Sequence, residues 1–212
     1  MAKFKLFLAF LFLLALSCGG EKAEHTAPTL PPQEQYRQMA EQLCAQPMLR
    51  ILCSQSITMN AGSNTYTYRL DQRVLLDTET GNYSAAGTYS YGNHEIKFEQ
   101  LYQNEALYLS VNEGRFAGEY VETKKWLPQP DMFTDHTAAE QGGYREIGFN
   151  DPKGEFWTAP EGARVLSASG SLSCDEQMAD LFTYCIEYVI EDVTFQVDMH
   201  MHLTPTQQSM PL

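Results

Sequence analysis

An alternation of apolar and polar residues between positions 65 and 77 sets the strongest limit on what this chain can fold into. The even positions are apolar and the odd positions polar, with two exceptions, Gln72 and Leu75. A period of two places one set on each face of a β-strand, so we expect a half-buried antiparallel strand over residues 65–77. At about 3.3 Å per residue this strand is roughly 43 Å long, which favours a curved sheet or half-barrel over a compact sandwich.

More strands follow, separated by short turns. We expect strands over residues 83–91, 94–102 and 106–111, and further strands over 143–149 and 163–172. Tyrosines recur along the first part of this region, at Tyr66, Tyr68, Tyr83, Tyr89, Tyr91, Tyr102 and Tyr108. Two interpretations fit them: a cross-strand aromatic ladder, buried or exposed, and a concave ligand surface, since tyrosine combines an apolar body with a polar tip.

The apolar phase changes within residues 183–203. Even positions are apolar from 184 to 190 and odd positions are apolar from 193 to 203, so the change falls at Glu191–Asp192. A slip of one residue would turn the core side of a strand toward water. We therefore expect a β-bulge or a tight bend at Glu191–Asp192, which again favours a curved sheet.

One clear helix precedes the strands. Over residues 33–46 an apolar stripe recurs at helical spacing, and Pro47 ends the helix. Residues 131–143 fit either a short helix or a loop. We expect an α+β, mostly β fold, in which residues 33–212 form a single domain with an N-terminal helix packed on a curved antiparallel sheet or half-barrel.

The N-terminal segment has the organisation of an export signal. Two lysines precede an apolar run of eleven residues ending at Leu16, shorter than the roughly 20 residues of a membrane-spanning helix. The residues Leu14-Ala15-Leu16-Ser17-Cys18 resemble the lipobox of bacterial lipoproteins, although Ala15 stands where that motif most often has Leu. The resemblance implies a signal peptide over residues 1–17 and a diacyl or triacyl anchor, with palmitate among its fatty acids, on Cys18.

Residues 18–32 are expected to form a lipidated, flexible tether. This stretch contains three prolines and has no apolar periodicity. The tether would attach the domain to a bacterial membrane, either the outer membrane or the outer face of the cytoplasmic membrane. The chain has 27 acidic and 14 basic residues, a net charge of −13, which argues against nucleic-acid partners and against a second, electrostatic contact with anionic lipid.

The four remaining cysteines fall in two local couples, Cys44 with Cys53 and Cys174 with Cys185. An even number in an exported chain favours disulfides, and local pairing needs little of the fold to bring the thiols together. We therefore expect these two disulfides, the first joining the helix to the first strand. The spacings are wider than those of zinc sites, and buried free thiols are the remaining alternative.

No motif assigns an enzymatic activity. The sequence lacks a Gly-x-Ser-x-Gly elbow and a phosphate-binding glycine loop, and we expect no catalytic residue, cofactor or metal. Asp198, His200 and His202 alternate along one strand face and have the chemistry to bind a transition metal, but a solvated polar face gives the same pattern. A looser cluster at residues 131–136, of Asp131, Asp135 and His136, has the same two interpretations.

The order of the elements resembles a family of carrier lipoproteins. A helix followed by a long antiparallel meander, with the strand pattern of residues 105–126, is similar to the LolA and LprG type, in which a curved sheet encloses a cavity for acyl chains. The resemblance implies a non-enzymatic envelope lipoprotein that binds an apolar or amphiphilic ligand in its curved sheet. The predicted disulfides and the acidic charge depart from that type, so no binding residue is carried over.

Two alternatives stand beside this hypothesis. The first is a protein-interaction or structural lipoprotein of the cell envelope, which holds an envelope protein partner through its tyrosine face without a small-molecule ligand. The second is an enzyme, which a stoichiometric metal dependent on His200 would support.

Overall fold

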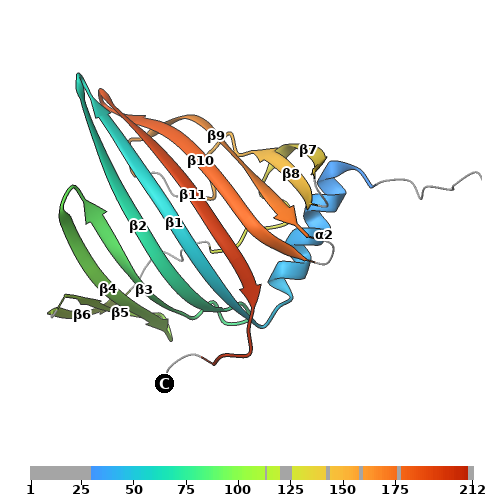
Figure 1. Ribbon diagram of the computed structural model, residues 1–212, viewed down its shortest axis with the longest axis horizontal. Helices are drawn as coiled ribbons and strands as arrows, with labels where there is room; N and C mark the ends of the chain where they lie inside the picture. Colours follow the sequence, from blue (N-terminus) through green and yellow to red (C-terminus); the bar gives the residue numbers. More distant parts are fainter. Residues whose placement is uncertain are drawn as a thin grey trace, which may run out of the picture. The chain divides into compact units, whose positions relative to one another are not determined.

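Eleven antiparallel strands form one curved sheet in the computed structural model, which describes residues 30–112, 114–119, 126–141, 144–157, 160–175 and 178–209 (Figure 1). The helix among these residues is α2 (Pro32–Cys44). The strands of the first half are β1 (Met48–Ala61), β2 (Asn64–Asp77), β3 (Tyr83–Tyr91), β4 (His94–Gln103), β5 (Ala106–Val111) and β6 (Gly114–Glu119). Those of the second half are β7 (Thr134–Gln141), β8 (Tyr144–Asn150), β9 (Arg164–Cys174), β10 (Ala179–Ile190) and β11 (Val193–Pro205).

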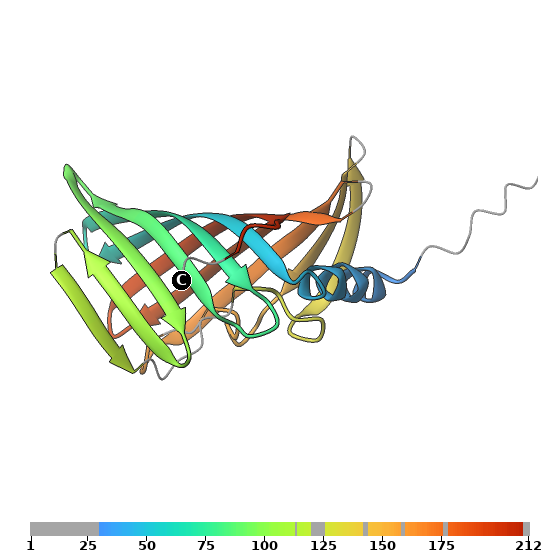
Figure 2. The same ribbon diagram turned by 90° about the horizontal axis from the view of Figure 1, so that it is seen from below.

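The sheet consists of two meanders joined at its centre. Its order is β6-β5-β4-β3-β2-β1-β11-β10-β9-β8-β7, so β1 and β11, the first and last of the described strands, pair with each other over thirteen residues. Strands β6 and β7 are the two ends of this order, and the sheet is open rather than closed into a barrel. Figure 2 shows it as an arch with α2 and the connecting loops on the concave side. The predicted fold class, an α+β, mostly β fold with a helix packed on a curved antiparallel sheet, is confirmed.

The change of apolar phase at Glu191–Asp192 is a hairpin turn, not a bulge within one long strand. Ile190 pairs with Val193, and the two residues between them form the turn, with Glu191 at φ 53°. Directly paired residues point to the same face of a sheet. A two-residue turn therefore moves the apolar set from even to odd positions without any irregularity in either strand. The run over residues 183–203 is thus divided between two strands, β10 and β11.

Residues 131–143, expected to be a short helix or a loop, contain strand β7 instead. This strand lies at the end of the sheet, where β8 is its one partner among the described strands, with a register shift between Thr134 and Thr137 and a positive φ of 52° at Asp135. A twisted edge strand has one neighbour, so its sequence needs no apolar alternation. The pairing with β8, a tertiary contact, determines the structure here.

Helix α2 packs on the concave side because its apolar stripe is continuous. Tyr36, Ala40 and Leu43 have no exposed surface and Met39 is 6% exposed. The helix begins directly after Pro31, with Pro32 at a position where proline costs no helical hydrogen bond. The Tyr36 hydroxyl donates to the carbonyl oxygen of Gln129 at 3.1 Å, which ties the helix to the loop before β7.

Aromatic rings fill the core between α2 and strands β8 to β10. The rings of Phe133 and Phe149 stack with centroids 3.9 Å apart, and both lie near Phe182 on β10. Gly170 on β9 is required by this packing, because a Cβ atom there would lie 2.2 Å from the carbonyl oxygen of Thr183 and 2.8 Å from the ring of Phe149. The core on this half of the sheet is therefore closed by large side chains.

None of the four described cysteines, Cys44, Cys53, Cys174 and Cys185, forms a disulfide in the structure. The predicted disulfide between Cys174 and Cys185 is wrong, because the register pairs Cys185 with Ser169, five residues from Cys174 along β9. Side chains five residues apart on neighbouring strands also point to opposite faces, and no disulfide can bridge that separation. Cys44 and Cys53, the second predicted couple, both pack in or against the main core cluster and are likewise unbridged.

Pro31–Leu212 forms one of two units into which the chain divides. The predicted signal peptide, most of the predicted tether and the lipidation site Cys18 lie outside the described residues, and they stay predictions. Within the described part of the chain, none of the helical structure is long and apolar enough to cross a membrane.

Candidate ligand-binding surfaces

The concave face of the sheet, called here the inner face, is buried at one end and open at the other. Strand register arranges its side chains in rows that cross β1, β2 and β3. The row of Leu49, Leu76 and Tyr83, nearest the end of α2, is buried, and so is the row of Ile51, Val74 and Ala85. Burial then falls toward the hairpin tips, where the row of Ile57, Tyr68 and Tyr91 is half-buried or exposed. The concave side of the sheet therefore presents an apolar surface that is half-buried to exposed near the hairpin tips.

Four tyrosines dominate this open part, and we call them the tyrosine cluster: Tyr66 and Tyr68 on β2, Tyr89 and Tyr91 on β3. The ring of Tyr68 stacks on that of Tyr91 with centroids 4.7 Å apart and on that of Tyr89 at 5.9 Å, and Tyr66 lies 6.5 Å from Tyr91. Contacts of this kind contribute about 0.5–1.5 kcal/mol each beyond the area they bury. The rings thus hold one another in place and form a preorganised surface.

The electrostatics of the cluster suit an uncharged ligand. Partial burial raises the pKa of the Tyr89 phenol, and the neighbouring Tyr68 adds to this effect. The Tyr89 phenol therefore stays neutral at physiological pH, and its hydroxyl group can donate and accept a hydrogen bond. Aliphatic side chains of Ile57, Met59 and Leu70 lie on the same face beside the rings and are half-buried.

The structure divides the seven predicted tyrosines into three groups. Tyr83 and Tyr102 stack at 5.5 Å, and Trp126 covers Tyr83 edge-on, so Tyr83 belongs to the core and the partly buried Tyr102 packs against it. Tyr108 pairs with Leu101 on the opposite, outer face of the sheet and is 50% exposed. The remaining four form the tyrosine cluster. The aromatic ladder is therefore confirmed, partly in the core and partly on the open concave face, and a ligand contact by the tyrosine cluster stays a prediction.

Two buried amides mark the boundary between the covered and the open part of the inner face. Gln55 on β1 is 3% exposed and Gln72 on β2 is 7% exposed. The register places them in adjacent rows, between Val74 on the core side and Tyr68 on the open side. Gln72 appeared in the sequence only as an exception to the alternation of its strand.

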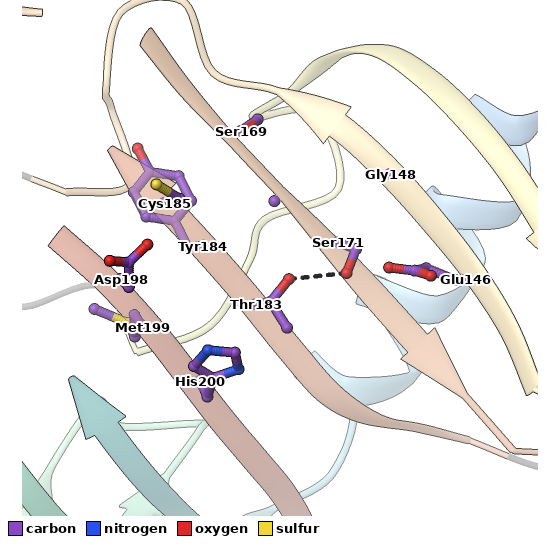
Figure 3. Close-up of a pocket in the computed structure, with 11 residues that line it drawn as sticks. Glu146, Gly148, Ser169, Ser171, Thr183, Tyr184, Cys185, Asp198, Met199 and His200 are labelled. Atoms are coloured by element: carbon purple, nitrogen blue, oxygen red, sulfur yellow. Dashed lines mark hydrogen bonds between the residues drawn. The ribbon is translucent and has the colours of Figure 1, made fainter. Parts of the chain in front are cut away.

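A second candidate surface is a polar groove of about 350 Å³ on the outer face of β8 to β11 (Figure 3). Its side chains include the hydroxyls of Ser169, Ser171 and Thr183 together with Glu146, Asp198 and His200. The hydroxyl groups of Ser171 and Thr183 are hydrogen-bonded at 2.9 Å. Tyr184 and Met199 also line the groove, and its hydroxyl, carboxylate and imidazole groups suit a small hydrogen-bonding molecule.

Cys185 in this groove is not an activated nucleophile. Burial raises the pKa of its thiol to about 11, assisted by the hydrogen bond that the thiol donates to Asp198 and by the negative charges of Asp198 and Glu187. A nucleophilic cysteine needs a lowered pKa, because the thiolate is the reactive form. This environment therefore does not support thiol catalysis.

The residues with metal-ligand chemistry do not come together as a metal site. Asp198, His200 and His202 share the outer face of β11, as predicted, and pair with Ser56, Ser54 and Leu52 of β1. Asp135 and His136 lie on β7, whereas the carboxylate of Asp131 accepts a hydrogen bond from Arg37 on α2 at 2.7 Å. Among the described residues, no group of three or more histidine, cysteine, aspartate or glutamate side chains has the geometry to hold a metal ion.

Comparison with solved structures gives several distant similarities. A DUF1329 family protein from Desulfovibrio piger is 10% identical with a TM-score of 0.36, covering 85% of this chain and 96% of its own. A LolA superfamily protein from Nitrosomonas europaea is 7% identical with a TM-score of 0.28, covering 86% and 96%. The LolA type, which the sequence pattern resembles, is thus among these structures. Both TM-scores lie below 0.5, so the similarities assign neither a family nor an activity to this chain.

No protein-family model matches the sequence, and the search of curated proteins gave no match.

Proposed function

We propose that this protein is a non-enzymatic, membrane-anchored envelope lipoprotein that binds an apolar or amphiphilic ligand on the open part of its inner face. The observation that carries the proposal is the gradient of burial along β1 to β3. Rows near α2 are buried, whereas Ile57, Tyr68 and Tyr91 remain half-buried or exposed on the concave side. Contiguous apolar surface that the domain does not cover itself is typical of a binding site.

The shape and chemistry of the surface support a small apolar ligand. Curvature allows the sheet to contact a ligand from more than one strand, and the rings of Tyr68 and Tyr91 are already fixed by stacking. A preformed apolar surface with a few polar groups is the usual composition of a lipid or small-molecule site. Burying hydrocarbon there contributes about 25 cal/mol for each Å² removed from water.

The membrane anchor in this proposal rests on the sequence. The lipobox-like segment ending at Cys18 supports attachment to a bacterial membrane, and the proline-containing residues 18–32 would let the domain reach a ligand beside it. Placing an apolar-binding surface next to a membrane shortens the path of a lipid into it.

A lipid extraction and native mass spectrometry test the proposal. The full chain with Cys18→Ser, which cannot be acylated at that position, is purified from a bacterial envelope fraction without detergent. We expect a lipid-sized adduct that is removed by organic extraction, and a smaller adduct population in Tyr68→Ser. A protein free of adducts that also takes up no lipid from vesicles would contradict the proposal. A stoichiometric protein bound to the tyrosine cluster in place of lipid would support the alternative of an interaction protein.

A further inference from the structure

Gln72 is a buried amide with an unsatisfied donor in the apolar inner face. Its side chain is 7% exposed, and its Nε2 atom is buried without a hydrogen-bond partner. Leaving a buried donor unsatisfied costs roughly 1–3 kcal/mol, so a structural role does not explain an amide at this position. An apolar residue would maintain the alternation of β2 at no such cost.

The neighbours of Gln72 in its row leave the amide without an obvious acceptor. Cys53 on β1 supplies a thiol, which accepts hydrogen bonds weakly, and Gly87 on β3 has no side chain. A Cβ atom at Gly87 would lie 2.8 Å from the Cβ of Gln72 and 2.9 Å from the ring of Phe98. The next row toward the hairpin tips contains the buried amide of Gln55 on β1, followed by the half-buried side chains of Leu70 and Tyr89. Gln72 therefore stands where the covered core meets the proposed binding surface.

We propose that the Gln72 amide donates a hydrogen bond to a carbonyl oxygen of the ligand, and that the inner face therefore selects a neutral acyl ester. This inference rests on the proposed function. The bound ester places its carbonyl oxygen at Gln72 and its hydrocarbon chain along the tyrosine cluster. Binding then satisfies the donor that is unsatisfied in the free protein.

The charge of the surface selects the ester over a free fatty acid. The inner-face positions of β1 to β5 carry no lysine or arginine, and His94 lies at the hairpin tip, away from the row of Gln72. Burying a carboxylate without a cationic partner is far more costly than burying a neutral carbonyl group that accepts a hydrogen bond. An ester carbonyl meets both the shape and the charge of the site.

Competition between two probes tests the proposal on the full chain with Cys18→Ser. N-phenyl-1-naphthylamine, a fluorescent apolar dye without oxygen, is titrated directly, and methyl laurate and laurate are measured by displacing it. The variants are Gln72→Met, which keeps the length but removes the donor, and Gln100→Met, the same change at a half-buried inner-face position of β4. Thermal unfolding of each ligand-free variant is measured in parallel.

We expect Gln72→Met to weaken methyl laurate binding about tenfold, or 1.4 kcal/mol, without weakening dye binding. Gln100→Met leaves the affinities for dye and ester close to those of the parent, and laurate binds more weakly than the ester. Ligand-free Gln72→Met melts at the same or a higher temperature, because the unsatisfied donor is gone. An unchanged ester affinity in Gln72→Met, or a lower melting temperature of this variant, overturns the role of Gln72. If the parent protein still binds the dye, the proposed function stands. A protein that binds no dye overturns both.

Discussion

The hydroxyl of Tyr184 donates a 2.7 Å hydrogen bond to Oδ2 of Asp151, and both residues are almost fully buried. Oδ1 of Asp151 accepts from the backbone N–H of Glu155 at 2.9 Å, and Oδ2 also accepts from that of Phe156 at 3.0 Å. Asp151 thus fixes the loop after β8, whose Phe156 ring packs on Phe182 and Tyr184 of β10. This loop covers the inner face over β10, which leaves the apolar surface open on the side of β2 and β3.

Removing this hydrogen bond should destabilise the domain without changing its ligand surface. We expect Tyr184→Phe to lower the free energy of unfolding by about 2 kcal/mol, since the lost bond is made to a carboxyl group that stays buried. Tyr144→Phe is the control, because Tyr144 is 53% exposed and its loss should cost less than about 0.5 kcal/mol. Denaturant unfolding measures both. Equal stability of Tyr184→Phe and the parent would contradict the role assigned to Asp151.

His136 should make the domain less stable in mild acid. Burial lowers the pKa of its imidazole, against the opposing effect of Asp135, and its ring lies 4.8 Å from that of Tyr36 on α2. The folded state thus takes up the proton at a lower pH than the unfolded state, whose histidine titrates near pH 6.5. The unfolding free energy therefore falls as the pH decreases from about 7 toward the folded pKa.

Urea unfolding at about pH 7.5 and about pH 5.5 isolates this contribution. The loss of stability between the two values should be smaller in His136→Gln than in the parent. His202→Gln changes an exposed position of β11, and this variant should lose as much unfolding free energy between the two pH values as the parent protein does. The same pH dependence in all three proteins would show that His136 is not involved.

Cys185 should react slowly with alkylating reagents. The pKa of its thiol is raised to about 11. Burial makes the largest contribution, and the hydrogen bond to Asp198 and the negative charge of Asp198 add to it. At about pH 8 the thiolate is a minor species, so iodoacetamide modifies the folded protein slowly at this residue. Asp198→Asn removes the charge and should accelerate the reaction several-fold.

Peptide mapping of the alkylated protein identifies the modified thiol, and Cys185→Ser gives the background rate. Cys185 recovered in a disulfide with Cys174 would contradict the register that places these residues five positions apart.

The sequence alone located β2 to β5 closely because their signals are local. Alternation marks each strand, and short turns with glycine or asparagine mark the ends, so the predicted strand over residues 83–91 coincides with β3. Edge strand β7 could not be found this way, since its structure depends on pairing with β8. The contact between Tyr184 and Asp151 joins residues 33 positions apart, and no local pattern encodes it.

The binding surface was only partly predictable. Tyrosine alternation indicated an aromatic face, but which rings are core depends on α2 and on Trp126, and these are tertiary contacts. The sequence did mark Gln72, since it is a polar residue among the apolar even positions of β2. A polar residue at such a position can contact a ligand, but it can equally form hydrogen bonds within the protein, and the sequence does not distinguish the two. The cysteine couples misled for a related reason: proximity in sequence says nothing about the faces of a sheet.

Loss of the tyrosine cluster should weaken apolar binding without unfolding the domain. Tyr68 is half-buried and stacks on both Tyr89 and Tyr91, so Tyr68→Ser removes the central ring of the cluster. We expect binding of N-phenyl-1-naphthylamine to weaken about tenfold, or 1.4 kcal/mol, since an aromatic contact contributes about 0.5–1.5 kcal/mol beyond the area that it buries. Tyr108→Ser, the same change on the outer face, should bind the dye as the parent does. Equal losses in the two variants would place the dye elsewhere.

Photolabelling with a diazirine-bearing acyl ester tests most directly whether the inner face binds the ligand. The full chain with Cys18→Ser is irradiated with the probe, digested, and mapped by mass spectrometry, with excess methyl laurate as competitor. We expect saturable labels on inner-face residues of β1 to β4, at and around Tyr68, Leu70, Tyr89 and Tyr91. Labels confined to the polar groove around Asp198 and His200, or labels that the competitor does not reduce, would contradict it.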